Sequence, residues 1–385
     1  MPYEPHAAHP ALYARKITMG GKREAGRRAL PVVPTLLVAL LVSALWFVGG
    51  VAQQIASPAP IPTDPDLKVA FIGDTANGAA FRSVLNLIRS EGAHLVVHQG
   101  DFDYGSNPAG FFATIDSVLG ANFPYFASVG NHDIGSWRTD CSDPDGCYAQ
   151  FLKDRMARLG VEPDDPDLND QMYSVTYRGL KIVFVGQDSV IAGDNTYAPY
   201  IRARLSADAH TWKICSWHKN QNAMQVGGKS DEMGWAVYET CKDLGAIIAT
   251  AHEHSYHRTK TLTSVQMQAV DPLCPDPNRL CVASGTPGKS FVFVSGLGGN
   301  SVRDQVRCLP STYPYGCNGE WARIYTSNQG ATFGALFIVF HVSGDPNRAY
   351  GYFKNLNGQV IEEFDITAGD RPDGGPAAPT GLTLR

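Results

Sequence analysis

The sequence predicts an α/β fold in which a mostly parallel β-sheet packs against another sheet, with helices on the outside. Between residues 67 and 130, short apolar runs alternate with segments whose apolar residues recur at helical spacing. The later part of the chain is richer in strand-like runs than in helical ones. With 385 residues, 44% of them hydrophobic and 18% charged, the chain is long enough for one large domain or two ordinary ones.

The elements up to residue 130 follow from two periodicities. A short apolar run that ends at a glycine indicates a buried strand, whereas apolar residues three to four apart indicate a helix. In chain order, we expect a strand at 67–73, a helix at 79–92, a strand at 94–100, a helix at 110–120 and a strand at 124–130.

The elements of the later part are mostly strands. Residues 173–186 consist of two β-type runs around Arg178 and Gly179, which is typical of a hairpin. Residues 232–245 have helical spacing and end in glycine. The remaining apolar runs predict strands at 212–218, 246–252, 289–296, 334–342 and 348–366.

The two ends of the chain differ in composition from the rest. Residues 1–31 form a basic segment, residues 32–52 an apolar run typical of a signal peptide or a single membrane anchor, and residues 53–66 a proline-rich linker. The basic flank predicts that everything after the apolar run is exported, either secreted or held to the membrane through 32–52 if that segment is not cleaved. Residues 366–385 have the composition of a flexible tail.

Cysteine usage indicates the same compartment. All eight cysteines follow the apolar run, and an even number in an oxidising compartment indicates disulfides. Three pairs are close in sequence and would each close a polar loop: Cys141 with Cys147, Cys274 with Cys281, and Cys308 with Cys317. The formal net charge is -5 and no basic stripe follows residue 31, so we expect no nucleic-acid partner. The oligomeric state stays open.

Five strand-like runs end directly in side chains that can bind metal ions. These are Asp74, Asp101 with Tyr104, Asn131 with His132, His218, and His252 with His254. Alone, each has an ordinary structural explanation, since an aspartate after a strand usually caps a turn and a single histidine is usually only hydrogen-bonded. Because all five follow strands, we expect them at one edge of one sheet. Together they supply enough ligands for two metal ions.

The order of these motifs, GD, GDxxY, GNH, H and HxH, resembles the calcineurin-like metallophosphoesterase superfamily, in particular its purple acid phosphatase branch. The resemblance covers residues 67–365, which would be the catalytic domain. It implies a four-layer α/β/β/α sandwich, with two packed mixed sheets flanked by helices. The chain departs from the usual pattern at Ala76, Ala251 and His257, which leaves the ligands intact.

The resemblance also implies a role for each residue. One ion would be held by Asp74, Asp101, Tyr104 and His254. The other would be held by Asp101 as the bridge and by Asn131, His218 and His252, and His132 would protonate the leaving group. A phenol ionises at neutral pH only beside a strongly polarising ion, so Tyr104 suits Fe(III), with Fe(II), Zn or Mn as the divalent partner.

The function implied is that of an exported phosphohydrolase, which cleaves small phosphate monoesters by attack of a metal-bound hydroxide. Two alternatives stay open: a diesterase that acts on nucleotides or lipid head groups, and a non-catalytic surface module stabilised by metal. Three carboxylates beside the predicted ligands, Asp103, Asp133 and Glu253, are expected as solvated loop groups rather than partners of the ligands.

Overall fold

The computed structural model describes residues 63–138, 141, 145–165, 168, 171–186 and 193–369. The basic segment at 1–31, the apolar run at 32–52, most of the linker at 53–66 and the tail beyond residue 369 therefore lie outside the described residues. Within the described part, none of the helices has the length and apolar character needed to cross a membrane.

The described residues contain two large sheets, each of seven strands. The first sheet has the strand order β11-β16-β15-β14-β1-β2-β3. Its strands are β1 (Leu67–Ile72), β2 (Leu95–His98), β3 (Tyr125–Ala127), β11 (Arg279–Val282), β14 (Gly334–Phe340), β15 (Arg348–Asn355) and β16 (Val360–Ala368). β1, β2 and β3 run parallel, whereas β14 pairs antiparallel with both β1 and β15. The sheet is therefore mixed rather than mostly parallel.

The second sheet has the order β13-β8-β12-β7-β6-β5-β4. Its strands are β4 (Tyr173–Tyr177), β5 (Leu180–Phe184), β6 (Trp212–Ser216), β7 (Ala246–Thr250), β8 (Tyr256–Thr259), β12 (Val292–Ser295) and β13 (Trp321–Tyr325). β5, β6, β7 and β12 are parallel neighbours, and β4 and β5 form the expected antiparallel hairpin. β9 (Leu262–Ser264) and β10 (Ala269–Val270) form a small separate pair.

The two large sheets pack face to face through aromatic side chains. Phe71 of β1 contacts Phe293 of β12 with ring centroids 5.1 Å apart. Trp212 of β6 meets Phe340 of β14 at 5.4 Å in the same way. Because aromatic rings bury a large apolar area, these contacts account for much of the core between the sheets.

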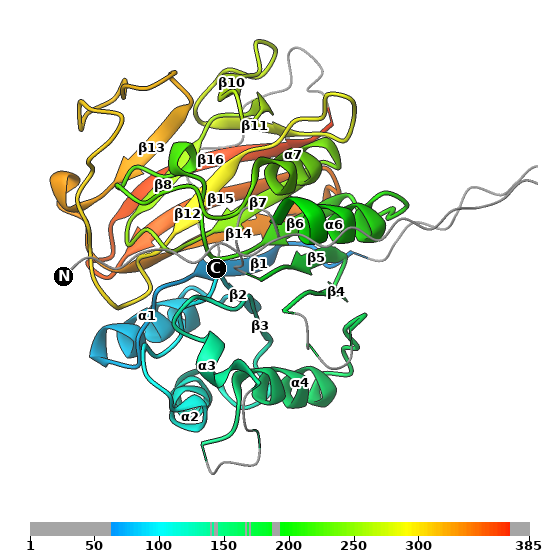
Figure 1. The fold of residues 1–385 in the computed structure, drawn as a ribbon, viewed down its shortest axis with the longest axis vertical. Helices are drawn as coiled ribbons and strands as arrows, with labels where there is room; N and C mark the ends of the chain where they lie inside the picture. The colour runs from blue at the N-terminus through cyan, green and yellow to red at the C-terminus, as the bar shows by residue number, and fades with distance from the viewer. Residues whose placement is uncertain are drawn as a thin grey trace, which may run out of the picture. The chain divides into compact units, whose positions relative to one another are not determined.

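Helices cover the outer face of each sheet (Figure 1). α1 (Ala79–Ser90), α2 (Pro108–Leu119) and α4 (Tyr148–Arg158) share one apolar core with the first sheet, and the short α3 (Ile134–Trp137) lies beside them. α6 (Ala198–Leu205) and α7 (Trp235–Asp243) form a second core with β5, β6 and β7. The predicted arrangement, two packed mixed sheets flanked by helices, is confirmed.

The elements that were not predicted from the sequence include α4, α6, β8, β11 and β13. In α4, charged residues interrupt the apolar positions, and α6 has only eight residues, too few to show a clear helical period. β8 reads Tyr-His-Arg-Thr, which lacks the apolar run expected of a buried strand, although all four residues are buried. Two of its side chains, Tyr256 and Arg258, donate to Glu362, which is distant in sequence.

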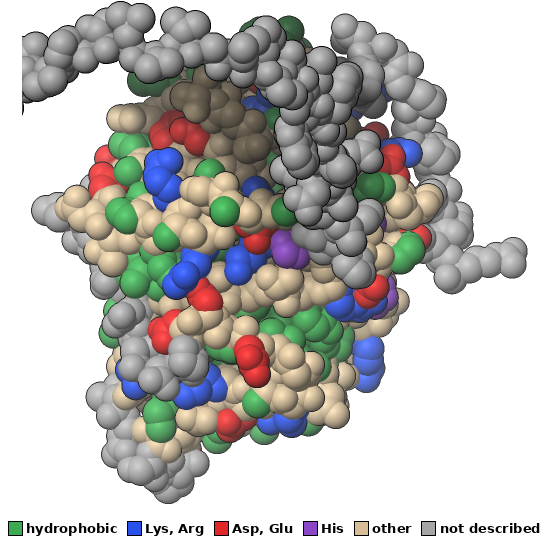
Figure 2. Space-filling view, turned by 90° about the vertical axis from the view of Figure 1, so that its right-hand side faces the viewer, with side chains coloured by type: hydrophobic (Ala, Val, Ile, Leu, Met, Phe, Trp, Pro, Cys, Tyr) green, Lys and Arg blue, Asp and Glu red, His purple; other side chains and the backbone are tan. Residues whose placement is uncertain are grey.

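The surface carries both signs of charge. On the face shown in Figure 2, Lys and Arg side chains are interspersed with Asp and Glu rather than gathered in one block.

Four disulfides join the eight cysteines. The predicted pairs Cys141–Cys147, Cys274–Cys281 and Cys308–Cys317 are confirmed. The fourth bond, Cys215–Cys241, connects β6 to α7 within the core. Because disulfides persist in oxidising compartments, this complete pairing indicates a protein that functions outside the cytoplasm.

Candidate metal centre

The predicted site residues meet where the carboxyl ends of strands from both sheets come together. Asp74, Asp101 and His132 follow β1, β2 and β3 of the first sheet, whereas His218 and His252 follow β6 and β7 of the second. The expectation of a single sheet edge is therefore wrong. Periodicity identified the strands but not the sheet to which each belongs, because sheet assignment depends on pairings between distant segments.

Three oxygen and nitrogen donors form a first group around Asp74. The Tyr104 hydroxyl lies 2.9 Å from Asp74 Oδ1 and 3.0 Å from His254 Nε2. His254 Nε2 lies 3.2 Å from Asp74 Oδ1. We call Asp74, Tyr104 and His254 the first donor group. Its three atoms are close enough together to bind one cation.

A second donor group consists of Asp101, His218 and His252. His218 Nε2 lies 3.2 Å from Asp101 Oδ2 and 3.0 Å from His252 Nδ1. His218 Nε2 is also 4.0 Å from Asp74 Oδ1, so the two donor groups adjoin each other. One ligand atom from each of these residues falls within 4.8 Å of the other two.

Asn131 lies beside the second donor group. The residues on either side of it both approach Asp101: a Cβ on Gly130 would come within 2.1 Å of the Asp101 backbone nitrogen, and the His132 backbone N–H donates to Asp101 Oδ1 at 3.0 Å. The side-chain oxygen of Asn131 is buried and has no hydrogen-bond partner among the described residues. A buried oxygen without a partner is costly unless a further group binds it, and a cation would do so.

Four of the donor residues have left-handed backbone conformations. Asp74, Asp101, Tyr104 and His252 have φ values of 55°, 58°, 55° and 68°. Such values are uncommon for residues other than glycine and concentrate at functional sites, where surrounding contacts hold the strained backbone. These backbone conformations direct four side chains, from the three loops that follow β1, β2 and β7, toward one place.

Asp133 connects the loop that follows β2 to the loop that follows β3. Its carboxylate accepts backbone N–H groups of Asp101 and Phe102, both at 2.8 Å, and of Gly130 at 2.7 Å. Asp133 and Glu253 are buried, so the expectation that they are solvated is wrong for both. Asp103 accepts the backbone N–H groups of Gly105 and Asn107, as a turn residue does.

Each donor histidine has a partner on its other ring nitrogen. His218 Nδ1 lies 2.7 Å from the Gln99 carbonyl oxygen, and His254 Nδ1 contacts Ser301 Oγ. His252 Nε2 lies 2.9 Å from Glu232 Oε2. Partners of this kind fix the orientation and tautomer of a metal-binding imidazole. The sequence reading missed all three. Of these partners, only Ser301 could have been found from the sequence, because it follows the glycine-rich run at 296–299.

The electrostatics of the site favour a cation. Although burial opposes it, contact with His254 and His218 holds the pKa of Asp74 well below its usual range. Burial also opposes the charged form of His218, but Asp101 and Asp74 raise its pKa to about 9. Two buried carboxylates therefore demand positive charge, which a proton on His218 supplies when no cation does.

The pKa of His252 is shifted the other way. Burial lowers it to about 4, so the ring is neutral at neutral pH and one nitrogen keeps a lone pair. Neutral imidazole and carboxylate together suit iron, zinc or manganese.

His132 differs from the donors in its exposure. Its side chain is exposed, and its ring lies over that of Tyr104 with centroids 4.4 Å apart. It therefore borders the donor groups on the side open to solvent.

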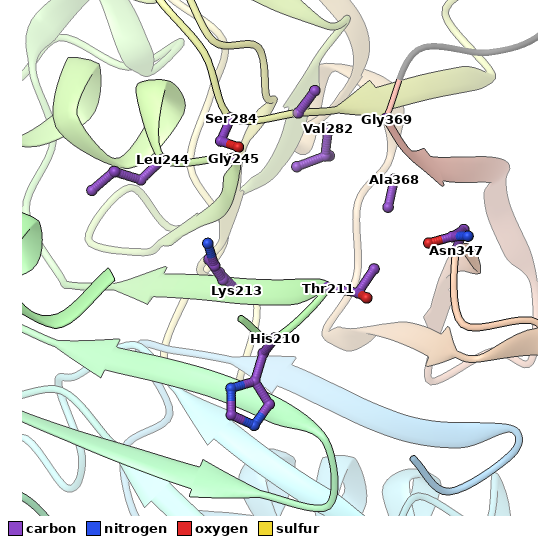
Figure 3. Close-up of a pocket in the computed structure, with 11 residues that line it drawn as sticks. His210, Thr211, Lys213, Leu244, Gly245, Val282, Ser284, Asn347, Ala368 and Gly369 are labelled. Carbon is purple, nitrogen blue, oxygen red and sulfur yellow. The ribbon is translucent and has the colours of Figure 1, made fainter. Parts of the chain in front are cut away.

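Two further features lie outside this centre. The cluster of Cys308, Cys317 and Glu320 has no free thiolate to offer a metal, because its cysteines form a disulfide. A cavity of about 390 Å³ is lined by residues such as Thr211 and Gly245, which precede β6 and β7 (Figure 3). It thus lies at the opposite ends of the strands that lead to His218 and His252.

Comparison with known proteins finds a similar family for part of the chain. Residues 67–256 match the family described as calcineurin-like phosphoesterase. These residues, just under half of the chain, therefore resemble a family that uses a binuclear metal centre. No curated protein matches the chain.

Several solved structures are similar to the chain at low sequence identity. GAP50, described as the anchor in the inner membrane complex of Plasmodium, is 11% identical, with a TM-score of 0.48 over 82% of this chain and 100% of its own. PhoD is 11% identical, with a TM-score of 0.46 over 82% of this chain and 76% of its own. The protein TT1561 of Thermus thermophilus is 14% identical, with a TM-score of 0.37 over 60% of this chain and 89% of its own. Likeness at this level does not transfer a substrate or a partner.

Proposed function

We propose that this protein is a calcineurin-like metallophosphoesterase of the purple acid phosphatase type, which cleaves small phosphate monoesters outside the cytoplasm. The observation that carries the proposal is the pair of adjoining donor groups, 4.0 Å apart between His218 Nε2 and Asp74 Oδ1. Two cations held about 3.5–4 Å apart clamp the attacking and leaving oxygens of a displacement at phosphorus.

The donor groups suggest how two ions would be held. Asp74, Tyr104 and His254 would bind the first ion, and Asn131, His218 and His252 the second. Asp101 would bridge the two, because its carboxylate contacts His218, which also lies 4.0 Å from Asp74 of the first donor group. This arrangement would also occupy the unpartnered oxygen of Asn131.

Tyr104 indicates the kind of first ion. Burial, together with Asp74 and Asp101, raises the pKa of its hydroxyl far above the ordinary value. Only a strongly polarising ion would then ionise it, so Fe(III) is the proposed occupant of the first site. The second site, with a neutral amide oxygen and two imidazoles, suits Fe(II), Zn or Mn.

Different residues of the chain would have different roles in hydrolysis. When bound, the two cations activate water and neutralise charge on the phosphoryl group. The buried aspartates would bind the cations, and hydrogen bonds from the Asp101 backbone N–H to Asp133 and from the His132 backbone N–H to Asp101 would fix the position of the Asp101 carboxylate. The exposed ring of His132 would donate a proton to the leaving oxygen as the P–O bond breaks.

The first prediction tests the iron assignment. Purified protein supplied with iron and zinc should bind two metal equivalents and absorb in the visible, because a phenolate bound to Fe(III) gives a charge-transfer band. Tyr104→Phe should remove the band, whereas Tyr350→Phe, which removes a phenol of β15 bonded to Glu363, should leave it. Metal analysis and an absorption spectrum measure both. An active wild type that is colourless and contains only zinc would show the assignment to be wrong.

A substrate comparison tests the reaction class. A monoesterase should release p-nitrophenol from p-nitrophenyl phosphate faster than from bis(p-nitrophenyl) phosphate. Faster release from the bis ester would instead identify a diesterase. Metal-loaded protein that hydrolyses neither ester would contradict the proposal of an enzyme.

A further inference from the structure

We propose that Glu232 is a positioning residue that orients His252 and thereby sets how tightly the second cation is held. This inference rests on the proposed function, because it presumes that Asp101, Asn131, His218 and His252 bind an ion. It adds a residue that lies in the same β6–α7 connection as His218 but is not itself a proposed ligand.

The two nitrogens of His252 face different partners. Its Nδ1 lies 3.0 Å from His218 Nε2, within the second donor group. Its Nε2 lies 2.9 Å from Glu232 Oε2, on the other side of the ring. Since a carboxylate only accepts hydrogen bonds, the proton of the neutral ring resides on Nε2. The lone pair of Nδ1 then points toward the second donor group, as a metal ligand requires.

Glu232 is itself held in place by the loop that follows β6. Its backbone N–H donates to the Asn220 carbonyl at 3.1 Å, and its Oε1 lies 3.3 Å from Lys219 Nζ. Asn220 in turn donates from Nδ2 to the Ala251 carbonyl at 2.6 Å. The segments that carry His218, Glu232 and His252 are thus connected to one another, so the carboxylate reaches His252 from a fixed position.

The partner of His252 differs in charge from those of the other two donor histidines. The described partners of His218 Nδ1 and His254 Nδ1 are a backbone carbonyl and a hydroxyl, both neutral. A carboxylate partner makes the imidazole more basic as well as fixing its orientation, and losing one typically costs 10- to 100-fold, roughly, in metal affinity. Loss of Glu232 should therefore weaken the second site and leave the first site intact.

The experiment compares three variants for metal retention. Glu232→Ala removes the carboxylate, and Glu232→Gln keeps an oxygen acceptor without its charge. Asp231→Asn is the matched control, because Asp231 is the neighbouring carboxylate and accepts from the Asn222 backbone at 2.7 Å rather than from His252. Each protein, loaded with iron and zinc, is dialysed against increasing chelator, and its metal content and visible band are measured.

The expected result is selective loss of one ion. Glu232→Ala should release one of its two equivalents at a chelator activity about 10- to 100-fold lower than wild type, with the visible band of Tyr104 retained. Glu232→Gln should release this ion at a chelator activity between those of Glu232→Ala and wild type. Asp231→Asn should release it at the same activity as wild type. Equal retention by Glu232→Ala and wild type would overturn the inference, as would loss of both ions together.

A second pair of variants separates positioning from direct binding. In a His252→Ala background, adding Glu232→Ala should not weaken metal retention further, because the residue that Glu232 orients is gone. A full additional loss would mean that Glu232 acts on the ion directly, contrary to the inference. A wild type that never holds two ions would refute the proposed function itself, which is a different result from equal retention in wild type and variant.

Discussion

At the residue scale, exposure separates His132 from the donor side chains. Asp74 and His218 have 0% exposed surface, whereas the His132 side chain is exposed beside Tyr104. A residue that must reach a substrate needs that access, while a ligand to a cation is better shielded from water. This contrast supports the proposed proton donor independently of the motif in which His132 occurs.

The prediction for His132→Ala concerns leaving groups. Loss of the proton donor should slow hydrolysis of an alkyl phosphate by about 10²- to 10⁴-fold, because its poor leaving group must be protonated. Hydrolysis of p-nitrophenyl phosphate should fall much less, since p-nitrophenolate leaves without a proton. Turnover of both substrates measures the difference. His210→Ala, which removes an imidazole bonded to Asp208 before β6, is the control, and an equal loss on both esters would contradict the role of His132.

Residues near the metal centre could be predicted only where they closely follow an apolar run in the sequence. The eight proposed site residues each follow an apolar run within a few positions, so their place at strand ends could be inferred. Glu232 lies in a loop and does not directly follow an apolar run. Its contact with His252 exists only in the folded chain. Asp133 was misjudged for a related reason, since its burial depends on backbone N–H groups from another loop.

At the element scale, β8 joins the two sheets through a buried ion pair. Arg258 of β8 donates to Glu362 of β16, with Nη2 2.6 Å from Oε2 and Nε 3.0 Å from Oε1. The Arg258 guanidinium also lies 4.0 Å from the centre of the Phe364 ring. A two-pronged pair of this kind satisfies the buried guanidinium of Arg258 in a strand that lacks an apolar sequence.

The prediction for Glu362→Ala is a large loss of stability. Removing the carboxylate leaves the buried Arg258 charge without its partner, which should lower the free energy of unfolding by about 3–5 kcal/mol. Denaturant titration under non-reducing conditions measures this loss. Glu363→Ala, at the neighbouring exposed position of β16, should cost far less. Equal losses for the two variants would show that the ion pair does not stabilise the packing of the sheets.

A helix or strand could be predicted from the sequence when the interactions that form it lie close together along the chain. Strands such as β1 and β14 are continuous apolar runs, and their positions follow from composition alone. β8 is a strand because β12 and β13 pair with it on either side and Glu362 neutralises its arginine. Those causes lie at least 30 residues away in sequence, so no local window contains them.

At the scale of the whole molecule, the candidate metal centre is where loops of the two sheets meet. The first donor group combines Asp74 and Tyr104, which follow β1 and β2, with His254, which follows β7. The second combines Asp101 with His218 and His252 in the same manner. Each proposed ion would therefore link both sheets. The sequence indicated which residues would gather but not this junction, because the order of strands in a sheet is set by long-range pairing.

The last prediction follows from that junction. Ligands that bind only the folded state stabilise it, by about 2.7 kcal/mol for each ion present at 100 times its Kd. Removing the metals with a chelator should therefore lower the thermal midpoint of the wild type, and restoring them should recover it. Without cations, the Asp101 carboxylate is held by His218: although burial and Asp74 oppose its charge, contact with His218 keeps the pKa of Asp101 below its usual value.

Asp101→Asn distinguishes these two effects in the same measurement. The variant loses the proposed bridge, so metals should hardly raise its midpoint. Its metal-free form should be less stable than metal-free wild type, because the charged contact between Asp101 and His218 is lost. Thermal unfolding of both proteins, with and without chelator, provides the four midpoints required. If metals raise the midpoint of Asp101→Asn as much as that of the wild type, Asp101 does not bridge two ions and the two sheets are not joined in this way.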